Sequence, residues 1–229
     1  MNIVICTLKS WNIRMAENFK NDYINQYNIK IITAKSELDY NYIVNFKPDY
    51  IFFPHWSYII PEEIFKNFEC IVFHITDLPY GRGGSPLQNL IAGGKTETKI
   101  SALRVVKQLD AGPIYRKRDL SLYGNAEEIF IRTGKVIFNE MIPEIINNRL
   151  EPAEQEGEIV EFKRRKKSES EITDDMPLEK IYDYIRMLDA EGYPHSFIRF
   201  GNYKLSFTRA SLKDGKIIAD VEIKEVKDE

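Results

Sequence analysis

Cysteine and histidine are scarce in this chain of 229 residues, with two of the first and three of the second. None of them cluster at the spacing of a metal site, so we expect no metal. Cys6 and Cys70 each lie inside an apolar run. This placement is typical of buried free thiols in a reducing compartment rather than of a disulfide.

The chain also lacks a long hydrophobic stretch. No window approaches the ~20 consecutive apolar residues that would span a bilayer. Residues 1–13 do not combine a charged region with a following apolar region, so the sequence does not indicate secretion. We therefore expect a cytoplasmic protein with no membrane partner.

A strong charge of either sign is missing as well. The formal net charge is -3 at pH 7 and the pI is about 5.8, so the global field disfavours a nucleic-acid partner. The first apolar run, residues 2–6, leads into CTLKSWN (residues 6–12), which holds no G-x-G-x-x-G motif. This absence disfavours a nicotinamide cofactor.

The first half of the chain alternates between strand-like and helix-like segments. Short apolar runs rich in β-branched residues stand at 2–6, 29–33, 50–53 and 70–74, and segments with helical spacing at 11–27, 36–46 and 62–68. This alternation predicts an α/β fold with a parallel sheet covered on both faces. Beyond it we expect a helix at 86–91 capped by Ser85, strands at 99–106 and 114–122, and a long helix from Asn125 to about residue 146.

The character of the sequence changes after residue 150. Residues 151–176 are charged and poor in large apolar side chains, which is typical of a linker. A helix-like segment follows at 178–190, and three strand-like runs are separated by Gly201-Asn202 and Asp214-Gly215 turns. We therefore predict a catalytic domain over 1–150, a linker over 151–176, and a small β-rich C-terminal domain over 177–229, which could form a dimer interface.

Residues 73–91 carry the chemically most informative pattern. His74 ends a buried strand, where open α/β sheets place ligands. Three glycines at 81, 83 and 84 follow, and then a helix N-terminus at Pro86. Glycines let the backbone approach a ligand closely. A catalytic histidine and a satisfied structural histidine both remain open from this pattern.

Asp110 follows a later strand and would bring a carboxylate to the same edge of the sheet. It could accept the Nδ1 proton of His74, fixing the tautomer and raising the basicity of the ring. An amine that attacks a carbonyl needs such a base and donors for the oxyanion that forms. The alternative is that Asp110 caps a turn ahead of Gly112.

These segments resemble the family of folate-dependent formyltransferases. That family has Asn-x-His at a strand end, then Ser-Leu-Leu-Pro, Arg-Gly and a later Leu-Asp-x-Gly. This chain has Val72-Phe73-His74, Thr76-Asp77-Leu78-Pro79, Arg82-Gly83 and Leu109-Asp110-Ala111-Gly112. The loop from Trp56 to Pro61 and the Pro86-Leu87-Gln88 helix start are also similar to the family pattern.

The resemblance implies a Rossmann-like domain that transfers a formyl group from 10-formyltetrahydrofolate, with no metal. His74 and Asp110 would be its catalytic residues. The folate and substrate pocket would be formed by Trp56, Tyr58, Ile59, Pro61, Thr76, Leu78, Pro79, Arg82, Gly83 and Gln88.

One departure from the family pattern concerns the oxyanion. The asparagine that helps to hold it is replaced by Val72, which cannot donate a hydrogen bond. Losing one such donor typically lowers the rate about 10²–10³-fold. Protonated His74, a backbone N–H of the glycine-rich loop, or His55 could substitute.

The acceptor is suggested by the segment from Phe162 to Arg165, which resembles a double-arginine segment of amino-sugar formyltransferases. Arg164 and Arg165 would contact a nucleotide or phosphate, since guanidinium groups bind phosphate in a bidentate manner; a solvated charged run is the alternative. We expect the acceptor to be a nucleotide-linked 4-amino-4,6-dideoxy sugar of glycan biosynthesis. The alternatives are a methionyl-tRNA formyltransferase, or a relative that binds folate or a nucleotide sugar without turnover.

Overall fold

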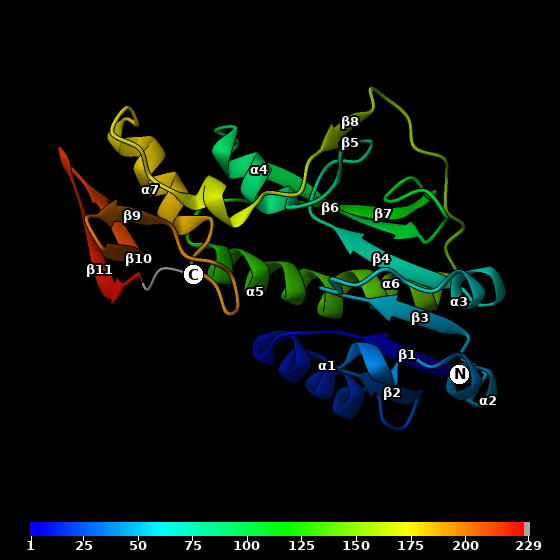
Figure 1. The fold of residues 1–229 in the computed structure, drawn as a ribbon. Helices are drawn as coiled ribbons and strands as arrows, with labels where there is room; N and C mark the ends of the chain where they lie inside the picture. The colour runs from blue at the N-terminus through cyan, green and yellow to red at the C-terminus, as the bar shows by residue number, and fades with distance from the viewer. Residues whose placement is uncertain (227–229) are drawn as a thin grey trace. The chain divides into compact units, whose positions relative to one another are not determined.

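The computed structural model describes residues 1–226 and divides into two compact units (Figure 1). Unit 1 comprises residues 1–83, 98–120 and 131–161, and unit 2 comprises 84–97, 121–130 and the chain from 162 onward. The units interleave in sequence, whereas the domains expected at 1–150 and 177–229 are consecutive. That consecutive division stays a prediction.

Unit 1 is built on a sheet of six strands in the order β2-β1-β3-β4-β6-β7. The strands are β1 (Asn2–Cys6), β2 (Asn28–Ile32), β3 (Tyr50–Phe53), β4 (Cys70–His74), β6 (Glu97–Arg104) and β7 (Ile114–Ser121). Strands β2, β1, β3 and β4 pair in parallel, as the alternating pattern predicted. The predicted α/β class with a largely parallel sheet is therefore confirmed.

Strand β6 departs from the parallel arrangement, because it pairs with β4 in the antiparallel direction. Ser101 lies opposite His74, and Arg104 lies opposite Ile71. The sequence predicted that Asp110 would bring a carboxylate to the edge of the sheet where His74 stands, and Asp110 Oδ2 does lie 3.5 Å from His74 Nδ1. The residues directly after β6, however, do not emerge at that edge. They instead leave β6 near the start of β4, where the Val105 N–H donates to the Cys70 carbonyl.

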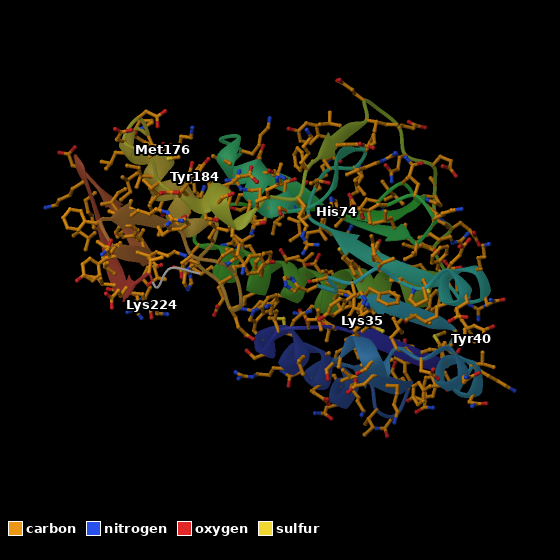
Figure 2. The ribbon with its side chains drawn as sticks, viewed as in Figure 1. Lys35, Tyr40, His74, Met176, Tyr184 and Lys224 are labelled. Carbon is orange, nitrogen blue, oxygen red and sulfur yellow. The ribbon has the colours of Figure 1, made fainter. Side chains whose placement is uncertain are left out.

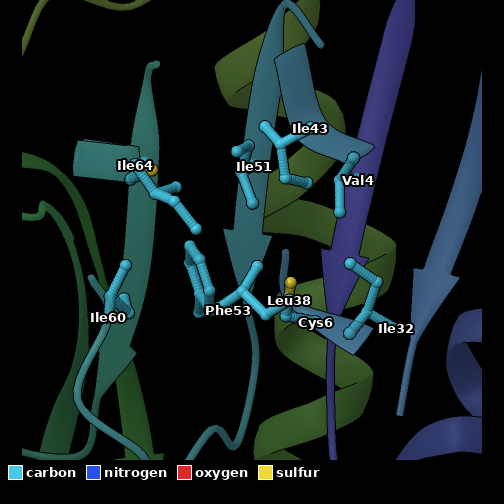
Figure 3. Close-up of a cluster of buried hydrophobic side chains, with 10 residues drawn as sticks. Val4, Cys6, Ile32, Leu38, Ile43, Ile51, Phe53, Ile60 and Ile64 are labelled. Carbon is cyan, nitrogen blue, oxygen red and sulfur yellow. The ribbon is translucent and has the colours of Figure 1, made fainter. Parts of the chain in front are cut away.

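Helices cover both faces of this sheet. On one face, α2 (Tyr40–Phe46) and α3 (Glu62–Asn67) pack over a buried apolar cluster. Figure 3 shows Val4 and Cys6 of β1, Ile51 and Phe53 of β3, Ile43 of α2 and Ile64 of α3 in this cluster. Cys6 and Cys70 are buried free thiols, as predicted, and burial raises the pKa of both.

A long helical segment and α1 (Ser10–Asp22) pack against each other, with the Phe19 and Phe138 rings 5.9 Å apart. The sequence predicted one helix from Asn125. The structure has α5 (Ala126–Val136), a π turn at Ile137–Met141, and α6 (Ile142–Asn148). Pro143 lacks the N–H that would bond the Asn139 carbonyl, which accounts for the widened turn just before it.

Capping confirms one of the predicted helix starts and corrects another. The Asn125 side chain accepts from the Glu128 N–H at 2.9 Å, and the Glu128 carboxylate accepts from the Asn125 N–H at 2.9 Å, which is a reciprocal capping box. Ser85 adopts a left-handed φ of 51° and makes no cap for α4 (Pro86–Ala92). Its hydroxyl instead accepts from the Arg165 N–H.

Unit 2 contains the predicted β-rich sheet, in the order β11-β10-β9. Its strands are β9 (Phe197–Phe200), β10 (Tyr203–Lys213) and β11 (Lys216–Glu225), and α7 (Leu178–Arg186) packs mainly on β10. Gly201 and Gly215 take positive φ at the two predicted turns. A dimer interface on this part of the chain stays a prediction.

Three short pieces complete the chain. Strand β5 (Tyr80–Gly83) pairs with β8 (Val160–Phe162). Single 3-10 turns stand at Lys35–Glu37 and Lys167–Ser170. Within residues 1–226, no helix is both long and apolar enough to cross a membrane.

Candidate active site

His74 lies at the carboxyl end of β4 with 8% of its surface exposed. Its Nε2 atom is 2.8 Å from the Gly81 carbonyl oxygen, and its Nδ1 atom is 3.5 Å from Oδ2 of Asp110. Each ring nitrogen therefore faces an oxygen atom. A ring that carries a proton on both nitrogens can donate toward both oxygens.

Asp110 is held in place by its own backbone conformation and by one amide. Its φ of 52° is left-handed, which non-glycine residues seldom adopt outside functional or tightly determined positions. Its Oδ2 accepts from the Gly83 N–H at 2.9 Å. The same oxygen therefore faces the histidine ring and a backbone donor of β5.

The loop between His74 and Gly83 is fixed from several sides. The Ser101 hydroxyl donates to the Thr76 carbonyl at 2.8 Å. Asp77 forms ion pairs with Lys99 and Lys117. Gly81 and Gly83 take φ values of 80° and 103°, which a side chain would strain. This backbone presents the Gly81 carbonyl and the Gly83 N–H to the His–Asp pair.

A pocket of about 210 Å³ opens beside this pair. His74 and Asp110 share it with the loop after β3 and with residues that follow β6; the lining residues are Phe53, Trp56, Tyr58, Ile59, Ile60, Phe65, Val72, Phe73, His74, Leu103, Arg104, Val105, Val106, Lys107, Leu109 and Asp110. Figure 2 marks the position of His74 in the chain. The pocket is therefore a narrow cleft with a largely apolar wall and a titratable pair at its end.

The loop after β3 supplies the aromatic part of the wall. The Trp56 and Tyr58 rings meet edge to face, 5.4 Å between centroids. The Trp56 indole N–H is buried and has no hydrogen-bond acceptor among residues 1–226. Ile59 is 79% exposed at the rim. A bound planar ligand could accept a hydrogen bond from the buried indole N–H. It could also cover the exposed apolar side chain at the rim.

The structure brings together part of the predicted site. Trp56, Tyr58 and Ile59 line the pocket with His74 and Asp110, whereas Pro61, Thr76, Leu78, Pro79, Arg82, Gly83 and Gln88 are not among its lining residues. The Gln88 amide is buried and donates to the Met187 carbonyl at 3.1 Å within unit 2. The His55 ring packs edge to face on Trp11 at 4.9 Å. The functional roles of all these residues stay predictions.

Sequence reasoning missed Gln155, which stands in the segment taken for a linker. Its Nε2 donates to the carbonyls of Asp110 and Gly112, each at 2.8 Å. Its Oε1 accepts from the Arg82 guanidinium at 2.8 and 3.1 Å. No sequence signal marks it, because the neighbouring acidic residues give this stretch the composition of a solvated connector.

The double arginine lies against the start of α4 in unit 2. Backbone contacts hold this segment there: the Gly84 N–H donates to the Phe162 carbonyl at 3.1 Å, and Asn89 Nδ2 donates to the Lys163 carbonyl at 3.0 Å. The Arg165 guanidinium stacks on Tyr184 and donates to the Glu169 carbonyl. Arg164 is exposed.

A second, larger hollow of about 770 Å³ lies between α1 and the helical segment 131–139. None of the predicted site residues lines it. Within residues 1–226, no group of three or more histidine, cysteine, aspartate or glutamate side chains could hold a metal ion. We therefore place the candidate active site in the pocket that contains His74 and Asp110.

Comparisons with known proteins give a consistent set of relatives. The C-terminal domain of methionyl-tRNA formyltransferase matches residues 167–224. A structure of methionyl-tRNA formyltransferase from Clostridium thermocellum is 61% identical, with a TM-score of 0.97 over 98% of this chain and 99% of that chain. The methionyl-tRNA formyltransferase of Geobacillus sp. (strain WCH70) is 31% identical over 65% of this chain and 49% of its own length. The chain thus spans about half the length of the curated relatives it matches.

Amino-sugar formyltransferases are more distant. A 4-N formyltransferase from Francisella tularensis is 18% identical, with a TM-score of 0.69 over 96% of each chain. At that identity the likeness shows a shared fold and nothing of the acceptor. The expected nucleotide-linked amino sugar, and with it a role in glycan biosynthesis, is therefore wrong, because the 61% identical relative bears the other name.

The expectation that nucleic acid is disfavoured as a partner is also wrong, since the same relatives are named for a tRNA substrate. The physical reason is that net charge averages over the whole surface. A total of -3 coexists with the run of five basic residues from Lys163 to Lys167. Phosphate binding depends on such local concentrations of charge rather than on the total.

Proposed function

Because the chain belongs to the family of folate-dependent formyltransferases, we propose that it transfers a formyl group from 10-formyltetrahydrofolate to the amino group of methionyl-tRNA. The observation that carries this proposal is the buried His74–Asp110 pair at the end of an aromatic-walled pocket, 3.5 Å between Nδ1 and Oδ2. The identity to a methionyl-tRNA formyltransferase over nearly the whole chain supports the choice of acceptor.

The folate would enter the pocket between the loop after β3 and the residues after β6. Its ring system would pack against Trp56 and Tyr58, and the buried indole N–H would donate to a polar atom of that ring. The exposed Ile59 would cover the outer part of the folate. This placement brings the formyl carbon toward His74.

In the reaction, the uncharged amine attacks the formyl carbon and a C–N bond forms. The nitrogen of the folate leaves as its bond to that carbon breaks. The proton lost by the attacking amine passes to the leaving nitrogen through a positioned acid–base group, a role that fits His74. Asp110 holds the imidazole ring in orientation and stabilises its positive charge when it is protonated.

The oxyanion needs a donor that Val72 cannot provide. Val72 lies two residues before His74 on β4 and lines the pocket. Of the two histidines among the substitutes expected from the sequence, His74 lines the pocket, whereas the His55 ring packs on Trp11. We assign the stabilisation of the oxyanion to the positive charge that the His74 ring carries after it has taken up the proton of the attacking amine, since both of its nitrogens already face the oxygen atoms of Gly81 and Asp110.

The RNA part of the acceptor would contact the basic segment from Lys163 to Lys167. Its backbone is anchored on the start of α4, so its side chains extend from a fixed support. Arg164 is exposed, whereas the Arg165 guanidinium is engaged by Tyr184 and Glu169. Arg164 is therefore the better phosphate contact of the two.

The test is formylation of methionyl-tRNA with 10-formyltetrahydrofolate as donor, measured as formyl-methionine released from the RNA. We expect turnover with the wild-type chain and its loss in His74→Ala. Arg164→Ala should raise the KM for the tRNA and lower the slope of log affinity against log salt by about one. Folate binding without formylation of any methionyl-tRNA would contradict the proposal and favour a binding relative.

A further inference from the structure

Gln155 connects the two segments that contact the catalytic pair. On one side it is bonded to the backbone that carries Asp110, and on the other to the side chain of Arg82. Arg82 stands between Gly81, whose carbonyl faces His74, and Gly83, whose N–H is bonded to Asp110. Gln155 is therefore bonded to the backbone of Asp110 itself. Through Arg82 it also holds the residue that lies between the other two partners of the pair, Gly81 and Gly83.

All of the hydrogen-bonding capacity of the Gln155 amide is used. Its two N–H groups meet two carbonyls, and its oxygen meets two nitrogens of one guanidinium. The partners fix the orientation of the amide, because a carbonyl needs a donor and a guanidinium needs an acceptor. Arg82 is 7% exposed, so its charge is largely sheltered from water and relies on this acceptor.

The backbone at Asp110 needs external support. A left-handed φ at a non-glycine residue costs of order 1–3 kcal/mol and persists only where the surroundings over-determine it. The loop is pressed closely against β6, since a Cβ added at Gly112 would lie 1.8 Å from the Arg104 carbonyl oxygen. Bonds to the carbonyls on both sides of Ala111 hold the turn that points the Asp110 carboxylate at His74.

We infer that Gln155 is a positioning residue for the His74–Asp110 pair, an inference that rests on the proposed formyl transfer. It acts on the reacting groups through Asp110 and Arg82 and does not line the pocket. A displacement of about 1 Å in a reacting group typically lowers turnover about 10²-fold. The segment that reads as a connector therefore contributes to catalysis.

Gln155→Glu is the sharpest test, because it keeps the acceptor for Arg82 and replaces the two donors with an oxygen that repels both carbonyls. We expect kcat to fall about 10–10²-fold with little change in the KM for methionyl-tRNA. Glu156→Gln makes the reverse change at an exposed neighbouring position and should behave as wild type. Circular dichroism and the thermal midpoint identify any variant that has failed to fold.

Two further measurements separate positioning from general support of the fold. In an Asp110→Asn background, Gln155→Glu should cause no further loss of kcat beyond about 2-fold, whereas independent effects would multiply. The Gly83 amide, which is bonded to Asp110, should exchange its hydrogen about tenfold faster in Gln155→Glu without any substrate present. Wild-type exchange at Gly83, or full multiplication of the two losses, would overturn the inference.

The exchange measurement also distinguishes the two proposals. If exchange at Gly83 is faster in Gln155→Glu but the wild-type protein formylates no methionyl-tRNA, Gln155 remains a positioning residue and the proposed acceptor is rejected. If exchange at Gly83 is unchanged in Gln155→Glu and the wild-type protein does formylate methionyl-tRNA, the positioning role of Gln155 is rejected and the proposed function remains.

Discussion

The Oδ2 atom of Asp110 lies 3.5 Å from Nδ1 of His74, although the strand that precedes Asp110 runs antiparallel to the strand that ends in His74. The contact is made because the loop after β6 turns back along β4 and is fixed there by the Gly83 N–H. At 3.5 Å a small movement of either side chain brings the two into full hydrogen-bond contact or separates them.

Asp110→Asn tests the charge of this pair with little change in shape. The asparagine oxygen can still accept from the Gly83 N–H, so the fold should be retained, while the negative charge beside His74 is lost. We expect kcat to fall about 10²–10⁴-fold, the usual contribution of a positioned acid–base pair. The thermal midpoint should remain close to that of wild type. Asp214→Asn, at an exposed turn, is the matched control, and equal activity in the two variants would remove Asp110 from the mechanism.

Val72→Asn restores the side chain that the resemblance led us to expect. Val72 is half-buried at the pocket wall, beside apolar residues that follow β6. If His74 alone stabilises the oxyanion, the added amide should leave kcat unchanged or raise it by less than the ~10²-fold that a required donor provides. Steady-state kinetics with methionyl-tRNA measures this. A rise of 10²-fold or more would show that the oxyanion lacks a donor in the wild-type protein.

Gly112→Ala should destabilise the protein and disturb the active site together. The new Cβ would lie 1.8 Å from the Arg104 carbonyl oxygen, and backbone cannot move aside as a flexible side chain can. We expect a loss of about 1–3 kcal/mol in the free energy of unfolding, together with reduced kcat. Gly94→Ala is the comparison, because it introduces only the strain of a positive φ, with nothing within 4 Å of its Cβ. Urea titration of both variants distinguishes crowding from backbone strain.

The Asp77 ion pairs predict a pH dependence of stability. Burial alone would raise the pKa of Asp77, but hydrogen bonds from Lys117 and Lys99 outweigh it and hold the pKa below its ordinary value. A carboxylate with a lowered pKa in the folded state stabilises the protein above its unfolded pKa of about 3.9, and this contribution disappears as pH falls through the folded value. Wild type should therefore be more stable than Asp77→Asn at pH 7.

That difference should shrink as the pH falls below about 4. Asp77 is 44% exposed, so screening by solvent keeps the effect small. The free energies of unfolding of wild type and Asp77→Asn, measured at pH 7 and near pH 3, provide the check. A difference that grows toward low pH would contradict the assigned direction.

Local patterns in the sequence predicted much of the fold and the central pair. The apolar runs rich in β-branched residues form the parallel strands, as predicted. Such runs are recognisable because a strand buried on both faces is apolar along its whole length. Asn125 was recognisable as a cap because its acidic partner stands three residues later. His74 and Asp110 were found because His74 ends a recognisable strand ahead of a glycine-rich loop, and Asp110 follows another strand two residues before Gly112.

Other features depend on long-range contacts that leave no local signature. Strand β6 runs antiparallel to β4. This direction depends on the path of the connecting residues 75–96, and the composition of the strand itself does not reveal it. Gln155 acquires its role from carbonyls more than 40 positions away along the chain. The Ser85 hydroxyl is engaged by Arg165 rather than by its own helix, so a sound capping rule gave the wrong result there. The acceptor was misjudged because the double arginine at Arg164 and Arg165 was matched to amino-sugar enzymes and the total charge was taken to disfavour RNA, whereas a short basic segment alone does not distinguish a nucleotide sugar from a tRNA.

The interleaving of the two units restricts how the chain could be recombined in evolution. The polypeptide passes between the units at residues 83, 97, 120, 130 and 161. A fragment beginning at residue 162 would lack the carbonyls of Leu122 and Gly124, which accept from the Arg186 guanidinium, and the Gln88 amide bonded to Met187. The C-terminal sheet therefore depends on residues from earlier in the chain. A recombination that exchanges residues 162 onward between relatives must also exchange the segments 84–97 and 121–130.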